Sequence, residues 1–291
     1  MSLVADVPTA VPAEPTVSSG RQVVRAVLRS PAGVVGVVLT ATFVTVGLLA
    51  PWLAPADPFA IIGPPLSPPT ASHPMGTDAL GRDVLSGVIH GARTSLLIAL
   101  GVGALVFVIG GAVGTAAGYR GGWLDDLLMR VTEGFQVLPR FFLALVVIAF
   151  FGAGLDRLVL VLGVTSWPML ARVVRSQTLS LRERDFVAAA RACGASDARI
   201  VLREIWPSVL PGAVNLLGLL IAQAMLIEAS LSFLGLGDPN AMSWGYLASE
   251  AQRFLRVAWW LSAFPGLAIL GAVLGLNLLG DAVTHALGGR E

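Results

Sequence analysis

Long uncharged stretches constrain this chain more than any other feature. A helix needs about 20 mostly apolar residues to cross the hydrocarbon core of a bilayer. Four stretches meet that length on their own: Ser30 to Ala56, Thr94 to Tyr119, Ile205 to Ile227 and Val257 to Gly280. Hydrophobic residues make up 55% of the chain, charged residues 13%, and the mean hydropathy is +0.80. Ordinary soluble domains do not sustain this balance, so we expect an integral membrane protein.

Two shorter uncharged stretches, Phe141 to Leu155 and Leu158 to Ala171, flank Arg157. Each covers only about 21 to 23 Å of a core of roughly 30 Å, so each needs help from its flanks. The segment Arg172 to Glu204 is rich in arginine, and the positive-inside rule places it on the cytoplasmic side with the basic N-terminal flank. Two long spans precede this segment, so an even number of crossings must separate it from the N-terminus. The two short stretches must therefore both cross or both fail to cross. We expect six spans, with both termini cytoplasmic.

The expected organisation follows from these spans. A cytoplasmic tail at 1–30 is disordered and then basic, with Arg21, Arg25 and Arg29. The transmembrane domain covers 31–285, and a short cytoplasmic tail covers 286–291. The spans are expected at about 31–54, 94–118, 134–153, 156–172, 208–230 and 258–280. Between them lie an outer segment at 55–93 and a cytoplasmic loop at 175–207. The outer segment begins as a proline-rich linker, and apolar residues at helical spacing from Asp78 to Leu96 predict an amphipathic helix at the outer interface.

Composition excludes several classes of function. All 19 basic residues are arginine, and without lysine the chain has no Walker A loop and is not a P-loop ATPase. A net charge of +1 argues against nucleic acid as a partner. One cysteine and three histidines provide neither a cysteine-built metal site nor a hydrolase motif. We expect no catalytic residue and no resident metal. His73 and His90 are either turn and interface residues or ligands for a metal ion that the protein handles as its substrate.

Glycines recur every four residues in the second span, at Gly110, Gly114 and Gly118. This spacing places them on one face of the helix, where small residues let another helix approach closely. The pattern predicts tight helix packing and carries no information about a substrate.

The cytoplasmic loop contains a helix-turn-helix pattern. An alanine-rich helix is expected at Asp185 to Ala192, with Gly194 as its left-handed cap. Ser196 is placed to cap a second helix. The small residues of the first helix would fit a groove of a cytoplasmic partner. Taken alone, the pattern leaves open a second interpretation, in which the helix merely connects two spans.

A resemblance favours the docking role. Residues Ala189 to Ser196 resemble the "EAA" loop of permease subunits of bacterial ATP-binding cassette (ABC) importers, in the form found in the dipeptide, oligopeptide and nickel branch. The likeness covers about residues 30 to 285, in order, and points to the "C" type of the two permease subunits. It is also carried by His73 to Ser86, Gly91 to Leu96, Glu228 to Gly237, and Trp259 to Asp281. Two places depart from the pattern: Ala188 replaces the glutamate that names the loop, and the tail from Ala282 to Leu287 is atypical.

The resemblance implies an all-α type I importer fold with six transmembrane helices, in the bacterial inner membrane. It implies a second homologous permease subunit, two ABC ATPase subunits or a fused ATPase that bind ATP and Mg, an extracytoplasmic solute-binding protein and a peptide substrate. The chain would hold no cofactor and perform no covalent chemistry. The residues expected to couple it to the ATPase are Asp185, Phe186, Ala189, Ala190, Gly194, Ala195, Ser196 and Asp197. The alternative is a secondary transporter driven by an ion gradient, which would need ion sites at mid-membrane.

Glu228 is a single carboxylate near the end of a long apolar stretch, followed by Ser230 and Ser232. Ionisable groups inside membranes usually face an aqueous path or a bundle interior. The three residues are therefore candidates for the translocation pathway or its gate. A structural role, in which the carboxylate accepts a hydrogen bond from one of the serines, is equally open.

Overall fold

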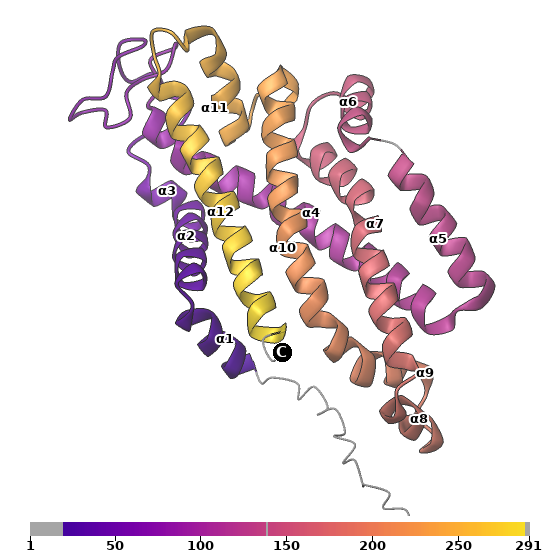
Figure 1. The fold of residues 1–291 in the computed structure, drawn as a ribbon. Helices are drawn as coiled ribbons and strands as arrows, with labels where there is room; N and C mark the ends of the chain where they lie inside the picture. The colour runs from indigo at the N-terminus through magenta and orange to yellow at the C-terminus, as the bar shows by residue number, and fades with distance from the viewer. Residues whose placement is uncertain (1–19, 138, 289–291) are drawn as a thin grey trace, which may run out of the picture.

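The structure, a computed structural model, describes residues 20–137 and 139–288, and the regular secondary structure of these residues consists of helices (Figure 1). Within these residues the only β-type pairings are two isolated antiparallel bridges, Ile61 with Arg82 and Thr77 with Asp83. Five helical runs are long and apolar enough to cross a membrane: α2 (Pro31–Leu48), α4 (Val84–Arg120), α7 (Leu155–Arg182), the run Asp197–Leu236 that contains α10 (Trp206–Leu231), and α12 (Trp260–Gly288).

A sixth crossing is made if two bent helices count as one span. These are α5 (Gly122–Val137) and α6 (Arg140–Phe151), whose axes differ by 76°. The expected span at 134–153 is therefore not one helix. Pro139, which has no N–H to donate, is the N-cap of α6. The apolar residues of 134–153 are divided between the end of one helix and the whole of the next.

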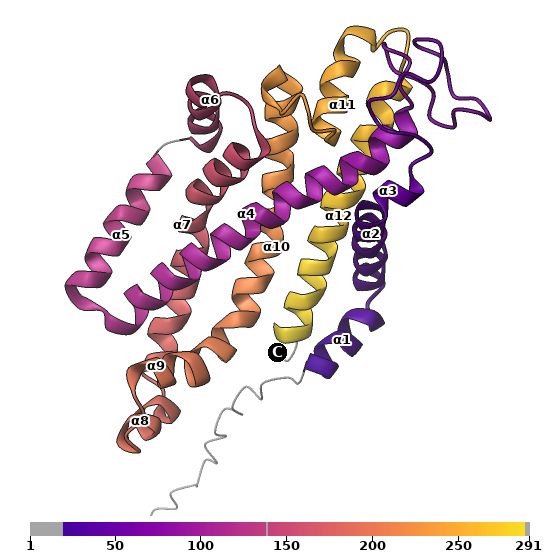
Figure 2. The same cartoon turned by 180° about the vertical axis from the view of Figure 1, so that it is seen from behind.

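The long helices stand side by side, and α4 crosses obliquely behind α12, α10 and α7 (Figures 1 and 2). One end of the bundle carries residues 55–83, the short α3 (Ala50–Leu53), and α11 (Trp244–Ala251). The other end carries α1 (Gly20–Arg29), the end of α12, and the loop with α8 (Asp185–Ala192) and α9 (Asp197–Ile200). Both described ends of the chain thus lie with the α8–α9 loop, as an even number of crossings requires.

Helix α4 packs on α7 through its glycines. A side chain at Gly110, Gly114 or Gly118 would collide with the carbonyl oxygens of Trp167, Ala171 and Arg175, respectively. These oxygens are four residues apart on α7, so the two backbones run against each other over several turns. The four-residue spacing of the glycines correctly predicted a close packing face.

Other boundaries differ from the expected ones. The amphipathic interfacial helix expected from Asp78 to Leu96 does not exist separately, because α4 starts at Val84 and continues to Arg120 without a break. The Asp83 carboxylate starts this helix by accepting hydrogen bonds from the Ser86 N–H and hydroxyl at 2.8 and 2.7 Å. Helix α7 likewise continues past 172 to Arg182.

The ends of the chain also differ from expectation. Residues 20–29 of the predicted disordered tail form α1, and residues 1–19 of that tail lie outside the described residues. In the predicted tail at 286–291, α12 continues to Gly288, and 289–291 lie outside the described residues. One apolar residue of α1, Val27, packs on the body of the protein with only 5% of its surface exposed, which gives a reason for the added helix.

The α4–α7 contact generates a stability prediction. Alanine is a better helix former than glycine by about 1 kcal/mol, so a Gly→Ala change in open space should stabilise the protein. Gly218 in α10 has open space around a new Cβ, whereas Gly114 does not. We expect Gly218→Ala to keep or raise the thermal unfolding midpoint of the detergent-solubilised protein. We expect Gly114→Ala to lower this midpoint, because overpacking costs about 1–3 kcal/mol of stability. Equal midpoints for the two variants would contradict the described packing.

Candidate functional site

The first arm of the α8–α9 loop is a short helix that ends in a Schellman motif. The Gly194 N–H donates to the Arg191 carbonyl at 3.0 Å, and the Ala195 N–H donates to the Ala190 carbonyl at 3.1 Å. Gly194 adopts a φ of +81°, and nothing lies within 4 Å of where its Cβ would be. The left-handed backbone alone therefore demands glycine here, as the sequence predicted.

The second arm starts a much longer helical run. Ser196 has the N-cap position of α9, but its side chain makes no capping hydrogen bond, so the predicted cap is only partly right. Helix α9 has four residues and continues through a π-helical turn, Val201–Ile205, into α10. The second arm and the following transmembrane helix are thus one continuous rod.

Apolar and polar contacts bind the loop to the body of the bundle. Val187 on α8 and Ile200 on α9 are fully buried, and Ala190 and Ala195 pack against the same core. The Tyr119 hydroxyl, at the end of α4, donates a hydrogen bond to Asp197 at 2.7 Å. The same hydroxyl raises the pKa of the Arg191 guanidinium above its ordinary value.

Arg182 adds a further anchor. Its guanidinium donates to the carbonyls of Gly118 and Tyr119, at 3.0 and 3.3 Å, and so satisfies acceptors at the C-terminal end of α4. It also pairs with Glu183 at 2.9 Å. Sequence reasoning missed Tyr119 and Arg182, because each reaches a partner more than 60 residues away along the chain.

The rest of the loop is open. Of the eight residues predicted to couple the chain to an ATPase, six are exposed and two, Ala190 and Ala195, are half-buried. The exposed ones are Asp185, Phe186, Ala189, Gly194, Ser196 and Asp197. Phe186 is the one aromatic residue of α8, a helix rich in alanine, and its side chain is 41% exposed. The predicted small-residue face is therefore divided: Ala189 and Gly194 point outward, while Ala190 faces the protein.

At the opposite end of the bundle, Glu228 is enclosed by the chain's own side chains. It is 2% exposed, and its Oε1 accepts hydrogen bonds from the hydroxyls of Ser232 and Ser243, both at 2.8 Å. Ser243 is also the N-cap of α11, where its Oγ accepts from the Tyr246 N–H at 3.1 Å. Glu228 therefore joins α10 to the start of α11. The structural alternative left open by the sequence, a bond from Ser230 or Ser232, is realised by Ser232, and the sequence gave no sign of Ser243.

Ser230 is not part of this cluster. It is exposed, and its hydroxyl donates to the Leu226 carbonyl of its own helix at 2.7 Å. It lines an open apolar groove between α6, α10, α11 and α12, together with Phe141, Leu226, Ala229, Phe233, Leu234, Ala248 and Ile269. The three candidate pathway residues thus separate into a buried pair and one groove residue.

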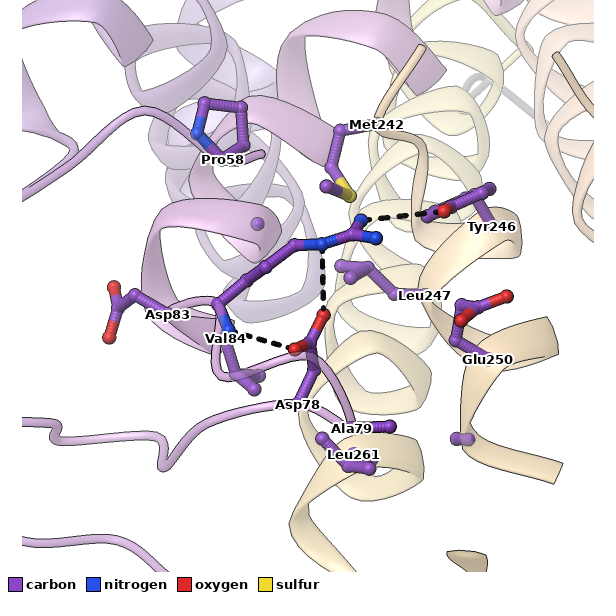
Figure 3. Close-up of a pocket in the computed structure, with 13 residues that line it drawn as sticks. Pro58, Asp78, Ala79, Asp83, Val84, Met242, Tyr246, Leu247, Glu250 and Leu261 are labelled. Atoms are coloured by element: carbon purple, nitrogen blue, oxygen red, sulfur yellow. Dashed lines mark hydrogen bonds and ion pairs between the residues drawn. The ribbon is translucent and has the colours of Figure 1, made fainter. Parts of the chain in front are cut away.

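The outer segment is fastened to α11 and α12 around a small pocket (Figure 3). The Arg82 guanidinium lies 3.6 Å from the Asp78 carboxylate and donates to the Tyr246 hydroxyl at 3.4 Å. The Trp260 indole N–H donates to the Thr77 carbonyl at 3.2 Å. Segments far apart in sequence therefore form one outer cap.

The two histidines of this region have separate partners. His73 Nδ1 lies 3.5 Å from the Asp83 carboxylate, and His90 Nδ1 lies 3.1 Å from the Ser86 carbonyl of its own helix. The structure assembles no group of three or more histidine, cysteine, aspartate or glutamate side chains fit for a metal among the residues it describes. The geometry gives the two histidines structural roles at the N-terminus of α4.

The Glu228 cluster generates a second stability prediction. Glutamine at this position keeps an oxygen that can accept both serine hydroxyls, whereas alanine removes the acceptor and leaves two buried donors unpaired. We expect Glu228→Ala to lower stability by about 1–3 kcal/mol and Glu228→Gln to cost less, measured as thermal midpoints in detergent. A Glu228→Ala protein as stable as wild type would rule out the carboxylate as the link between α10 and α11.

Comparison with known proteins gives consistent results. Residues 110–290 match the family described as "Binding-protein-dependent transport system inner membrane component". The dipeptide transport system permease protein DppC of Alkalihalophilus pseudofirmus is 34% identical over 276 residues, which cover 93% of this chain and 90% of the relative. The glutathione transport system permease protein GsiD of Escherichia coli is 37% identical over 251 residues, 84% of this chain and 82% of the relative.

A solved structure shares the fold. A chain of the inward-facing MetNI methionine ABC transporter aligns with a TM-score of 0.59 and 22% identity, over 69% of this chain and 95% of that chain. The likeness at this identity concerns the fold, which is the type I importer fold expected from the sequence. Family match, relatives and fold agree on one conclusion: the chain belongs to the binding-protein-dependent transport system inner membrane components, the membrane-spanning permease subunits of ABC importers.

Proposed function

We propose that this chain carries di- and oligopeptides across the bacterial inner membrane as half of a translocation pathway. The other half is a second homologous permease subunit. Two ABC ATPase subunits, or one fused ATPase, bind ATP and Mg and hydrolyse the nucleotide, and an extracytoplasmic solute-binding protein delivers the peptide. This chain contributes motion and a path, with no cofactor and no covalent chemistry of its own.

The observation that carries the proposal is the mechanical connection of the α8–α9 loop. Its outer surface, with Phe186, Ala189 and Gly194, is open to a partner. Its inner surface is fixed to the core through Val187 and to α4 through the bond between Asp197 and Tyr119. Because α9 continues into α10, a push on the loop is transmitted to a transmembrane helix as a rigid-body movement.

The peptide cargo is supported by the relatives. One relative is named for dipeptide transport and another for glutathione transport, and both cargoes are peptides. The family is that of importers that receive cargo from a binding protein. Family membership supports the ATP-driven importer and does not support the ion-gradient transporter that the sequence alone left open.

For the pathway, we assign different roles to the three candidate residues. Ser230 lines the open groove, so it is placed to face the second subunit or the cargo. Glu228 and Ser232 are buried behind it and hold α11, which contributes Ala248 to the wall of the same groove. In this proposal Glu228 is a positioning residue for the outer gate.

The proposed topology places both termini and the α8–α9 loop in the cytoplasm. A cysteine at Ser180, which is exposed near that end of α7, should react with an impermeant thiol reagent only from the cytoplasmic side. A cysteine at Ser72, exposed in the outer segment, should react only from outside. Both are made in a Cys193→Ser background, because Cys193 is itself exposed. Labelling of both positions from one side would eliminate the six-span arrangement.

The proposed coupling role is tested by a substitution that adds bulk and charge to the exposed surface of the loop. A residue with a Cβ at the left-handed Gly194 costs about 1 kcal/mol or more, and aspartate adds a charge at the contact. We expect Gly194→Asp to abolish peptide uptake, with the ATPase either released from the membrane or hydrolysing ATP without transport. Substrate-stimulated ATPase activity and uptake are measured together in reconstituted complexes with normal permease levels.

Ala198→Leu is the matched control. Ala198 is exposed on the second arm, where a larger side chain strains no backbone. We expect this variant to keep most of its uptake. Coupling at the wild-type level in Gly194→Asp would refute the docking role of the loop, whatever the control shows.

A further inference from the structure

Helix α1 has an apolar face that the described part of the protein leaves uncovered. Val24 and Leu28 are four residues apart, so they share one side of the helix, and they are 58% and 53% exposed. Val27, on a neighbouring side, is only 5% exposed and packs inward. Ala26 is exposed and lies about half a helical turn away from the Val24–Leu28 face. The helix therefore has a protein side, an exposed apolar side and an exposed small-residue side.

Two arginines border the apolar face. Arg25 and Arg29 are exposed, and neither forms an ion pair with any described residue. No acidic residue occurs in the sequence between Glu14 and Asp57. The uncovered surface of α1 is therefore both apolar and strongly basic, with no internal counter-charge from the neighbouring sequence.

The turn after α1 fixes this surface beside a membrane span. The Ser30 hydroxyl donates to the Val27 carbonyl at 3.1 Å and accepts from the Gly33 N–H at 3.0 Å, so one side chain joins the end of α1 to the start of α2. Pro31 occupies the first turn of α2. Val34 and Val35, one turn further on, are 40% and 47% exposed on a helix long enough to span the bilayer. A single turn thus holds α1 against the first residues of a helix that is apolar, largely exposed and long enough to span the bilayer.

We propose that α1 is a membrane-surface helix that binds anionic phospholipid. Val24 and Leu28 enter the boundary between headgroups and acyl chains, and Arg25 and Arg29 contact phosphate groups at the level of the headgroups. Amphipathic helices with a basic border lie in this position, and basic residues beside a span are attracted to anionic lipid. We favour lipid over a protein partner because the exposed apolar residues are flanked by two arginines without an ion pair among the described residues, and because the turn at Ser30 keeps the helix beside the start of a membrane span.

The depth of α1 tests the proposal. Single nitroxide labels are placed at Val24→Cys, Leu28→Cys and Ala26→Cys in a Cys193→Ser background, and the complex containing the full chain is reconstituted in vesicles of phosphatidylcholine with phosphatidylglycerol. We expect labels at 24 and 28 to collide more with oxygen, which concentrates in lipid, and the label at 26 to collide more with a water-soluble nickel chelate. Equal exposure of all three labels to the chelate would overturn the proposal, and so would protection of 24 and 28 from both reagents, which would indicate a protein contact.

The charge component is tested by the lipid composition. Adding phosphatidylglycerol to phosphatidylcholine should raise the equilibrium constant for insertion, reported by the Leu28→Cys label, by on the order of fivefold for each arginine engaged. The double variant Arg25→Gln and Arg29→Gln should lose this dependence while keeping the apolar insertion. A double variant with the same response to phosphatidylglycerol as the parent would show that these arginines do not bind the headgroups.

Discussion

The contact between α4 and α7 is the interaction on which the rest of the structure depends. In lipid, helices gain little from burying apolar surface, so close van der Waals packing must hold them together. Gly110, Gly114 and Gly118 let the backbone of α4 lie directly against the carbonyl groups of α7. Larger residues at these positions would separate the two helices and remove the support for everything attached to their ends.

Both ends of α4 carry attachments to the functional regions. At its start, Asp83 ends the outer segment and begins the helix. At its end, Tyr119 bonds to Asp197 of the α8–α9 loop. The carbonyls of its last turn accept from Arg182 of α7. A single helix of 37 residues therefore connects the segment 55–83, at one end of the bundle, with the α8–α9 loop at the other end.

The polar groups within the bundle mostly join elements of this chain. Glu228 is an example: it looks like a pathway residue in the sequence, yet its Oε1 accepts from Ser232 and Ser243 and links α10 to α11. A buried carboxylate must find such donors, because leaving it unpaired in a medium of low polarity is costly. The groove that Ser230 lines is instead open and mostly apolar, and its lining contains no charged side chain.

The sequence by itself determined the class of the protein, most of its spans and the left-handed turn in the α8–α9 loop. The length of the uncharged stretches and the placement of the arginines depend on the chemistry of single residues, and the left-handed turn at Gly194 depends on a local backbone preference. Such local features can be predicted from the sequence without knowledge of the fold. Tertiary structure decided what depends on distant partners. Pro139 divides an expected span into two helices at 76°, Ser243 reaches Glu228 from α11, and Tyr119 holds Asp197. No local pattern encodes these contacts, because each arises only when helices from separate parts of the chain pack at a particular rotation and depth.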